Sequence, residues 1–387
     1  METNWTLPGE PVTADQLVIG QLTSLPLSLL LEHTHATGQL IVVVDRTSYG
    51  VGQASADACT LLGRQLRGSE IMRNSQAGQG FNPFWFAGPA GPMSCRNPTD
   101  AELSRLATLI QRLLGFCAAE SLHPFLVQKL RGYYVSSYAA VGPDFSGFHA
   151  YLTGGRNPAP EDGWVPLFLA RTQCYTAYGR LAYLLNAEPR QLLFLHEVQN
   201  NYLVIGIGNR KADSERRADE WAHLLVLLHT VDGVLGGKDQ PLRVVLPHVS
   251  IAPWVPELGL LSAYLREGPA VNRAVIASWG GTVFESREPG PVARALLQAF
   301  DTQYLCAQPF GQRVYPEWPR SEQPLVELSG PAQELFFQLR PADENGRTLL
   351  AHCSSTGQMS VLRYAPSPWQ LEQRLLEGRG NRAAVQW

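Results

Sequence analysis

The alternation of apolar and polar residues predicts most of the secondary structure in the second half of the chain. Residues 191–237 contain two strands, Leu192–Val198 and Tyr202–Ile207, a Gly-rich corner and one long helix over Ser214–Leu235. From Leu224 to Leu228 this helix is apolar on every side, which is typical of a buried segment. The further predicted elements are strands at Leu242–Ile251 and Ala274–Ser278, helices at Val165–Leu185, Glu257–Arg266 and Pro291–Phe300, and a hairpin of Thr348–Ser354 with Gln358–Tyr364.

The first half of the chain has a different organisation. A strand is predicted at Leu40–Val44, and a helix begins at Thr99, which has capping-box spacing to Glu102. Thr153–Gly163 is rich in Gly, Pro and charged residues and is the best linker candidate. We therefore predict a mixed α/β protein in which an N-terminal α+β domain (1–155) precedes a C-terminal α/β domain (156–387). The second domain is expected to hold a mixed sheet flanked by helices.

The composition of the chain narrows the range of functions that are expected. Only 17% of the 387 residues are charged, against about 25% in an average protein, and the formal net charge is −3. No basic run with interleaved aromatic residues occurs, so a nucleic-acid partner is not expected. No stretch has the length of a membrane span. Six scattered cysteines predict reduced thiols in a cytoplasmic protein. A homodimer is a further possibility that the sequence leaves open.

Residues 38–68 contain an apolar strand, a turn at Thr47–Gly50 and a short helix with the spacing Ala54, Ala58, Leu61, Leu62 before Gly63. This pattern resembles the opening of a PAS sensor domain over about thirty residues. The resemblance implies a strand pair leading into a helix, and a sensory module that binds flavin, haem or bilin. The segment that follows, Ser69–Pro98, is rich in Gly, Pro and Asn and departs from the PAS pattern.

Three chemical motifs begin in residues 191–237, but none is complete. His196-Glu197 starts an HExxH metal motif, yet Asn200 replaces the second His and the flanking pattern is a strand rather than a helix. Gly206-Ile207-Gly208 lacks the third Gly of a dinucleotide loop. No P-loop, GxSxG elbow, CxxC or EF-hand loop occurs. No metal site and no cofactor are therefore predicted.

His229 and Asp232 form the most plausible catalytic pair in the sequence. They lie at i and i+3 of the long helix and so share a face. A buried His oriented by a carboxylate could act as a general base, but a core His satisfied by a nearby Asp is more common. Cys353 would need a distant His as its base, because its neighbour His352 points to the opposite face of the predicted strand.

Aromatic residues in predicted loops give the remaining signal. They are the candidate ligand-binding residues Phe84, Trp85, Phe86, Trp164, Trp254, Trp279 and Trp318. Large aromatics near Gly and Pro in a chain with little charge are consistent with a shared concave binding surface. For any one of them, however, packing onto the core is the simpler explanation.

The sequence therefore favours a recognition protein with no or weak catalysis. It would bind a peptide or an aromatic small molecule, most simply an extended peptide added to a strand edge, as an accessory protein of a biosynthetic or peptide-modifying pathway. The first alternative is an acyl-transfer or hydrolytic enzyme that uses His229 and Asp232, or Cys353. The second is a PAS-like sensory module. The sequence does not decide whether the protein is an enzyme, but it favours a protein that is not one.

Overall fold

The chain divides into two compact units that alternate along the sequence. Residues 1–71, 199–210 and 238–387 form a sheet unit, and residues 72–198 and 211–237 form a helical unit. The boundary expected between residues 155 and 156 falls inside the helical unit. The computed structural model describes residues 2–4, 15–19, 34, 37–45, 69–71, 80–114, 122–140, 142–154, 163–188, 202–206, 214–235, 240–246, 264–265, 273–279, 296–306, 330–337, 339, 347–353 and 358–364.

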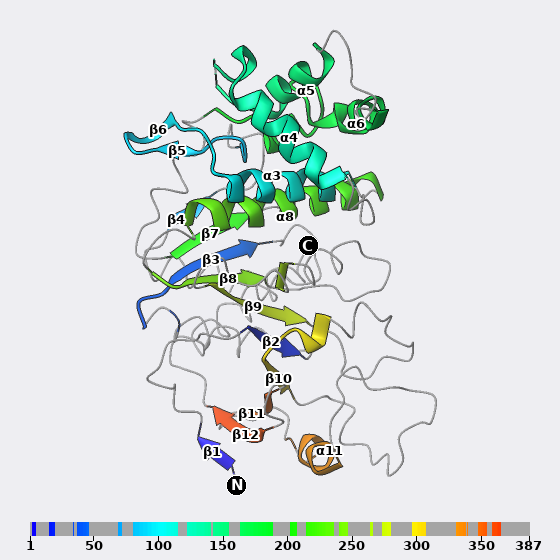
Figure 1. Cartoon of the computed structure of the whole chain (residues 1–387). Helices are drawn as coiled ribbons and strands as arrows, with labels where there is room; N and C mark the ends of the chain where they lie inside the picture. The colour runs from blue at the N-terminus through cyan, green and yellow to red at the C-terminus, as the bar shows by residue number, and fades with distance from the viewer. Residues whose placement is uncertain are drawn as a thin grey trace, which may run out of the picture. The chain divides into compact units, whose positions relative to one another are not determined.

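The sheet unit is built on a ten-stranded mixed sheet with the order β1-β12-β11-β10-β2-β9-β8-β3-β7-β4 (Figure 1). Its elements are β1 (Glu2–Asn4), β2 (Gln16–Ile19), β3 (Leu40–Asp45), β4 (Ser69–Ile71), β7 (Tyr202–Gly206), β8 (Leu242–Leu246), β9 (Arg273–Trp279), β10 (Thr302–Cys306), α11 (Gly330–Phe337), β11 (Arg347–Cys353) and β12 (Met359–Tyr364). Within the run of seven strands from β10 to β4, each strand is parallel to the next. β11 is antiparallel to both β10 and β12.

The central strands are buried because their sequences are apolar and β-branched. Leu40 to Val44 in β3 are at most 1% exposed, as expected for a strand that is covered on both faces of a parallel sheet. All five residues of β8 are buried as well. The outermost strands, β1 and β4, have only three residues each, and short edge strands limit pairing with other chains.

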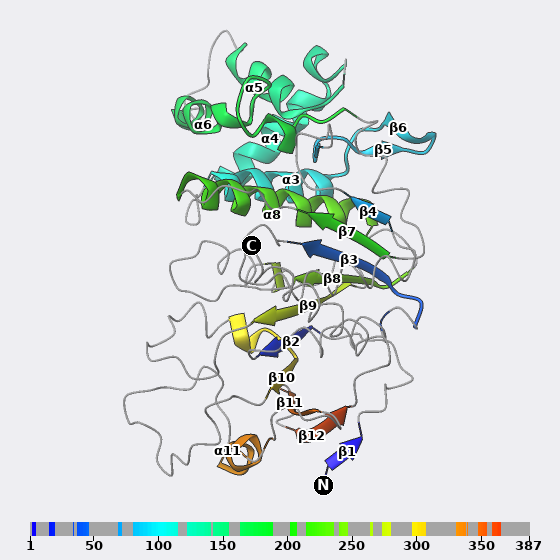
Figure 2. The same cartoon turned by 180° about the vertical axis from the view of Figure 1, so that it is seen from behind.

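The helical unit is held together by aromatic side chains. It contains β5 (Ala87–Gly88), β6 (Gly91–Cys95), α3 (Asp100–Leu113), α4 (Leu122–Tyr134), η3 (Ser137–Ala139), α5 (Phe145–Thr153), α6 (Val165–Thr172), η5 (Gln173–Tyr175), η6 (Ala182–Leu184) and α8 (Ser214–Leu235). Figure 2 shows α3 running beside α8. Phe84, Tyr133, Phe145, Phe148 and Phe168 are fully buried, and their rings contact one another edge-on or tilted.

Several sequence predictions are confirmed. The class is mixed α/β with a parallel central sheet. The long helix has the predicted bounds Ser214–Leu235, and Leu224 to Leu228 are all buried. α3 begins with the predicted capping box of Thr99 and Glu102, and β11 and β12 form the predicted hairpin. The helix predicted over 165–185 is shorter, because α6 ends at Thr172 and single 3-10 turns follow. Leu192–Val198 lies outside the described residues.

The PAS-like opening is wrong. β3 is flanked by β7 and β8, and both run parallel to it. The turn and strand pair that the resemblance implies would instead place an antiparallel partner beside β3. The short apolar run was compatible with both arrangements, and only long-range pairing distinguishes them.

Candidate functional site

The carboxyl ends of seven parallel strands meet at one edge of the sheet, which we call the carboxyl edge. β2 lies between β9 and β10. The strand that follows β2 in the chain is β3, which lies three places away on the β9 side of β2. The strand that follows β9 in the chain is β10, which lies on the opposite side of β2. The connections therefore diverge at β2. Ligands of open α/β sheets bind outside the carboxyl ends of the strands at such a switch point, so the end of β2 is the candidate site.

Register fixes which residues meet at this point. Ile19, the last residue of β2, pairs with Trp279 of β9 and with Leu305 of β10. On the far side of β9, Leu246 at the end of β8 pairs with Ala277. β9 therefore continues for two residues, Ser278 and Trp279, beyond the level at which β8 ends.

The residues at this edge offer little chemistry. Gly20 follows β2 in the sequence, Gly280-Gly281 follow β9, and Pro247-His248 follow β8. The only acidic residue that ends or directly follows any of the seven strands is Asp45, at the end of β3. β3 lies three places from β2, which is about 14 Å at the usual spacing between strands. Ser278 is fully buried and already has interaction partners.

The opposite edge of the same sheet, the amino edge, holds a group of charged side chains. Asp15 precedes β2 and accepts a hydrogen bond from Val275 N through Oδ1 at 2.6 Å. Its backbone N–H donates to Asp301 Oδ2 at 3.1 Å, and its carbonyl accepts from Thr302 N. Burial raises the pKa of Asp15; the Val275 hydrogen bond opposes that shift and the Asp301 carboxylate adds to it. Asp15 thus ties the starts of β2, β9 and β10 together.

Two arginines complete the amino-edge group. Arg243 on β8 is 0% exposed and donates from Nη1 to Leu242 O at 2.7 Å. Burial lowers its pKa to about 10, and the Asp15 carboxylate partly offsets that shift. Arg273 donates to Tyr264 O at 2.7 Å and lies 3.7 Å from the centre of the Tyr264 ring. Asp15 thus links neighbouring strands, whereas the two arginines bind the backbone carbonyls of Leu242 and Tyr264.

The predicted pair His229 and Asp232 lies on α8 in the helical unit. Burial lowers the pKa of His229 to about 3, and the positive charges of Arg105 and Arg112 on α3 add to that shift. An imidazole with so low a pKa is neutral at pH 7 but is a weak base. Asp232 has interaction partners of its own. The described contacts of His229 are therefore those of a histidine packed between two helices.

The remaining candidates are dispersed. Cys353 ends β11 and pairs in register with Thr302, at the amino edge of the sheet. Phe84 is 0% exposed and belongs to the aromatic core of the helical unit, whereas Trp85, Phe86 and Trp164 in the same unit are only partly buried. Trp279 ends β9 in the sheet unit. Trp254 and Trp318 lie outside the described residues.

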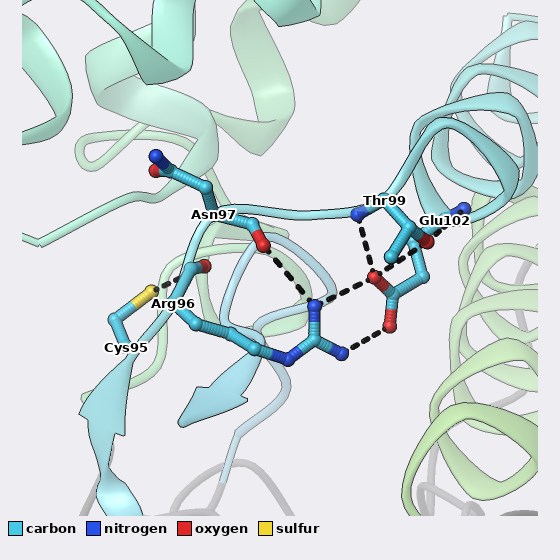
Figure 3. A network of polar contacts seen from close by, with 5 residues as sticks. All are labelled: Cys95, Arg96, Asn97, Thr99 and Glu102. Carbon is cyan, nitrogen blue, oxygen red and sulfur yellow. Dashed lines mark hydrogen bonds and ion pairs between the residues drawn. The ribbon is translucent and has the colours of Figure 1, made fainter. Parts of the chain in front are cut away.

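An ion-pair network at the start of α3 is the best-defined polar feature of the helical unit (Figure 3). Arg96 donates two hydrogen bonds to Glu102, at 2.8 and 2.6 Å. Glu102 also accepts from Thr99 N at 2.8 Å, and Thr99 Oγ1 accepts from Glu102 N at 3.3 Å. Hydrogen bonds from Arg96 lower the pKa of Glu102 to about 2. These hydrogen bonds hold the start of α3.

Metal and membrane features are not found among the residues that the structure describes. Within those ranges, no three His, Cys, Asp or Glu side chains gather in a way that could hold a metal ion. Nor is any described helix both long and apolar enough to cross a membrane.

Reasoning from sequence did not single out β2 or the residues after it. The run Gln16–Ile19 has only four residues, too few for a periodic pattern, and it is followed by Gly20 and not by a complete phosphate-binding motif. The one available signal was a short apolar run ending in Gly, and such runs are common.

No protein-family model and no curated protein sequence matches the chain. Solved structures do match. VirB4 of Thermoanaerobacter pseudethanolicus is similar at a TM-score of 0.57 and 16% identity, over 92% of this chain and 91% of that one. The bacterial conjugative coupling protein TrwB is more distant, at 0.46 and 14% identity over 91% of this chain and 84% of that one. TrwB in complex with ADP and Mg²⁺ has a TM-score of 0.44 and 15% identity, over 91% of this chain and 85% of that one.

These similarities correct the predicted function and partners. A peptide-binding accessory protein of a biosynthetic pathway is contradicted, because the chain shares its fold with VirB4. The acyl-transfer and sensory alternatives are contradicted with it. The predicted partners, a peptide or aromatic small molecule and no nucleic acid, are contradicted together with that function. The chain shares its overall fold with VirB4, a mixed α/β fold with a parallel central sheet.

Proposed function

We propose that the chain is a subunit of a conjugation-type motor assembly that keeps the motor fold but lacks the residues for nucleotide hydrolysis. The observation that carries this proposal is the sequence directly after β2. That strand ends at the switch point of the sheet, and the next eight residues are Gly-Gln-Leu-Thr-Ser-Leu-Pro-Leu, residues 20–27.

A P-loop follows a strand with the pattern G-x-x-x-x-G-K-[S/T]. Gly20 matches the first Gly, but Leu25, Pro26 and Leu27 stand where the second Gly, the Lys and the Ser or Thr are required. The Lys reaches the β- and γ-phosphates, the hydroxyl binds Mg²⁺ and backbone N–H groups cradle the phosphates. Proline has no N–H to donate, and leucine has no ligand atom. The single Gly-Lys pair of the chain, Gly237-Lys238, is followed by Asp239.

The second requirement is an acidic residue that holds the same Mg²⁺. It must come from a strand close to β2, because Mg²⁺ binds oxygen at about 2.0–2.1 Å. β9 and β8 end in Trp279 and Leu246, followed by Gly280 and Pro247. Asp45 is too distant, at about 14 Å along the sheet. The P-loop residues and the Mg²⁺-binding acid are therefore both missing, although the strands that would position them are present.

Assignment to a motor assembly rests on how much of the fold is retained. The similarity to VirB4 spans 92% of this chain and 91% of VirB4, so it includes both the sheet unit and the helical unit. Loss of nucleotide chemistry within a complete motor fold favours a role in assembly with other motor subunits. Regulation or stabilisation of an active partner is the simplest such role.

The test measures ATP binding and hydrolysis by the purified full chain, alone and with an active VirB4-type ATPase. Alone, we expect no turnover above buffer and no Mg-ATP binding tighter than about 1 mM, or −4.1 kcal/mol. In the mixture we expect co-sedimentation and a changed turnover of the active ATPase. Turnover near about 1 s⁻¹ by the chain alone, which is ordinary for an enzyme, would contradict the proposal and indicate an active motor.

A further inference from the structure

We propose that β1 is an exchangeable strand, which pairs with its own β12 in a single chain and with β12 of a second copy when two chains meet. The interaction surface is the outer edge of β12, and its occupant is residues 2–4 of the other copy. Such self-association goes beyond the proposed function, because it does not depend on nucleotide chemistry.

β1 is joined to the sheet by a single short ladder. Residues 2–4 pair with residues 361–363 of β12, and the two strands are parallel. Figure 1 shows β1 at the end of the sheet, beyond β12. A parallel ladder is slightly less stable per residue than an antiparallel one, and this ladder is the shortest of those that join β1, β12, β11, β10 and β2. The pairing of β1 is therefore the easiest to release in this part of the sheet.

β12 does not depend on β1 for its place in the sheet. All six of its residues, from Met359 to Tyr364, pair with β11 in an antiparallel hairpin. β1 covers only residues 361–363, so the outer edge of β12 is twice as long as the strand that occupies it. Backbone N–H and C=O groups on such an edge are a template for a strand from another chain. Release of β1 therefore leaves a preformed acceptor edge.

The positions of β1 and β2 set the distance that their connection must span within one chain. β12, β11 and β10 lie between them, which is about 19 Å across the sheet. Asn4 lies level with Thr348, one position beyond Cys306, whereas Asp15 lies one position before Thr302. Asn4 is thus six positions further along the strands than Asp15, or about 20 Å. The straight line between the two residues is about 28 Å.

The connection has little spare length for this distance. Eleven residue steps join Asn4 to Asp15, and a fully extended chain of that length spans at most about 36–40 Å. Pairing within one chain therefore uses about three quarters of the full reach. Short connections under strain favour exchange of a strand between copies, because a second copy can bring its β12 edge closer. With only three residues, β1 offers little edge to a further strand, so pairing stops after one exchange.

The test uses cysteine pairs in the full chain and a short bismaleimide cross-linker. Thr3 and Leu362 are paired in register, so Thr3→Cys and Leu362→Cys are made in separate chains, which are then mixed, and also together in one chain. Every variant carries Cys95→Ser, because Cys95 is exposed. Thermal unfolding selects the variants that fold. Glu2→Cys with Val361→Cys, the neighbouring pair in the register, replaces the first pair if that pair does not fold.

Two matched controls test the register and the connection. Thr3→Cys is mixed with Gln358→Cys, because Gln358 is exposed but lies four residues before Leu362, or about 13 Å away. The second control inserts about eight Gly and Ser residues after Gly9 in the Thr3→Cys chain, which adds about 26 Å of reach.

We expect a covalent dimer from the mixture of Thr3→Cys with Leu362→Cys, and none from either variant alone or from the mixture with Gln358→Cys. The insertion should lower the yield of dimer at least about threefold, because the chain's own β12 edge becomes easier to reach. The proposal is overturned if the first mixture gives no dimer, whether or not the double variant closes within one chain. It is also overturned if the mixture with Gln358→Cys gives as much dimer, or if the insertion leaves the yield unchanged. ATP turnover by the wild-type chain would overturn the proposed function and leave this result as it stands.

Discussion

The sheet unit and the helical unit place their charges differently. The sheet unit has Arg243, which is 0% exposed, in the middle of its amino-edge group with Asp15 and Asp301. No other formally charged side chain is buried to this degree in the part of the chain that the structure describes. The helical unit fills its interior with uncharged aromatic rings and places its main ion pair, Arg96 with Glu102, at a helix start (Figure 3).

This difference separates stability from function within the sheet. In an α/β sheet the carboxyl edge carries ligand chemistry, yet among the described residues that end the parallel strands here only Asp45 is charged, and the other charges described above are at the amino edge. There Asp15 accepts a hydrogen bond from Val275 of β9, and Arg243 donates one to Leu242 O in its own strand, β8. The amino-edge group therefore maintains strand order, and its loss should unfold the protein rather than change an activity.

The largest effect should come from Arg243. Arg243→Ala removes a buried cation whose charge acts on Asp15, alongside that of Arg273, and creates a cavity, so we expect a loss of about 4 kcal/mol in the free energy of unfolding. Arg243→Met keeps most of the volume and should cost clearly less. Urea unfolding of both variants, and of each combined with Asp15→Asn, measures the coupling. A loss below about 1 kcal/mol for Arg243→Ala would show that the buried charge is not needed.

Phe84 is the counterpart in the helical unit. It is 0% exposed, and its ring centre lies 5.9 Å from those of Phe145 and Phe148. We expect Phe84→Ala to lower the free energy of unfolding by about 3 kcal/mol, because the cavity would open among packed rings. Phe86, two residues later and only partly buried, is the matched control and should cost less than half as much on substitution by Ala. Equal losses would mean that the aromatic core does not depend on Phe84.

Sequence reasoning identified the long or strongly periodic elements and missed the short ones. α8 has 22 residues and β3 has five consecutive apolar residues, so local pattern alone was enough to place them. β2 and β10 have four and five residues, and pairing with strands far along the chain decides their state. The match between Ile19 and Trp279, 260 positions apart, leaves no trace in local spacing.

The candidate site was hidden for the same reason. The location of the site depends on strand order. Its main property is that other residues replace those that a P-loop requires, and a motif search reports such a replacement only as the absence of a match. His229 illustrates a second limit of reasoning from sequence. Its spacing to Asp232 indicated an acid–base pair, but Arg105 and Arg112, more than 100 residues earlier, determine its charge environment. Helix packing brought those arginines to it, and periodicity does not reveal which helices pack together.

A smaller effect is expected at the start of α3. Glu102→Ala removes the capping box and both hydrogen bonds from Arg96, so we expect a loss of about 1–2 kcal/mol. Asp100→Ala is the matched control in the same helical turn. Its ion pair with Arg131 is largely exposed, at 79% and 59% of the two side chains, and should contribute almost nothing. Chemical unfolding at neutral pH compares the two; similar losses would mean that the network in Figure 3 adds nothing beyond a surface ion pair.

The smallest effect distinguishes the two units by the sign of their pH dependence. Arg96 lowers the pKa of Glu102 from 4.5 to about 2, so its contribution to stability is present above 4.5 and is lost as the pH falls through the folded pKa. Burial raises the pKa of Asp15 above 3.8, so its contribution is complete below 3.8 and is lost as the pH rises through the folded pKa. Between about pH 6 and pH 3, the destabilisation by Glu102→Gln should therefore shrink, whereas that by Asp15→Asn should grow. Urea unfolding of the wild type and both variants at each pH gives the two slopes, and slopes of the same sign would show that the amino edge does not bury the Asp15 carboxylate as described.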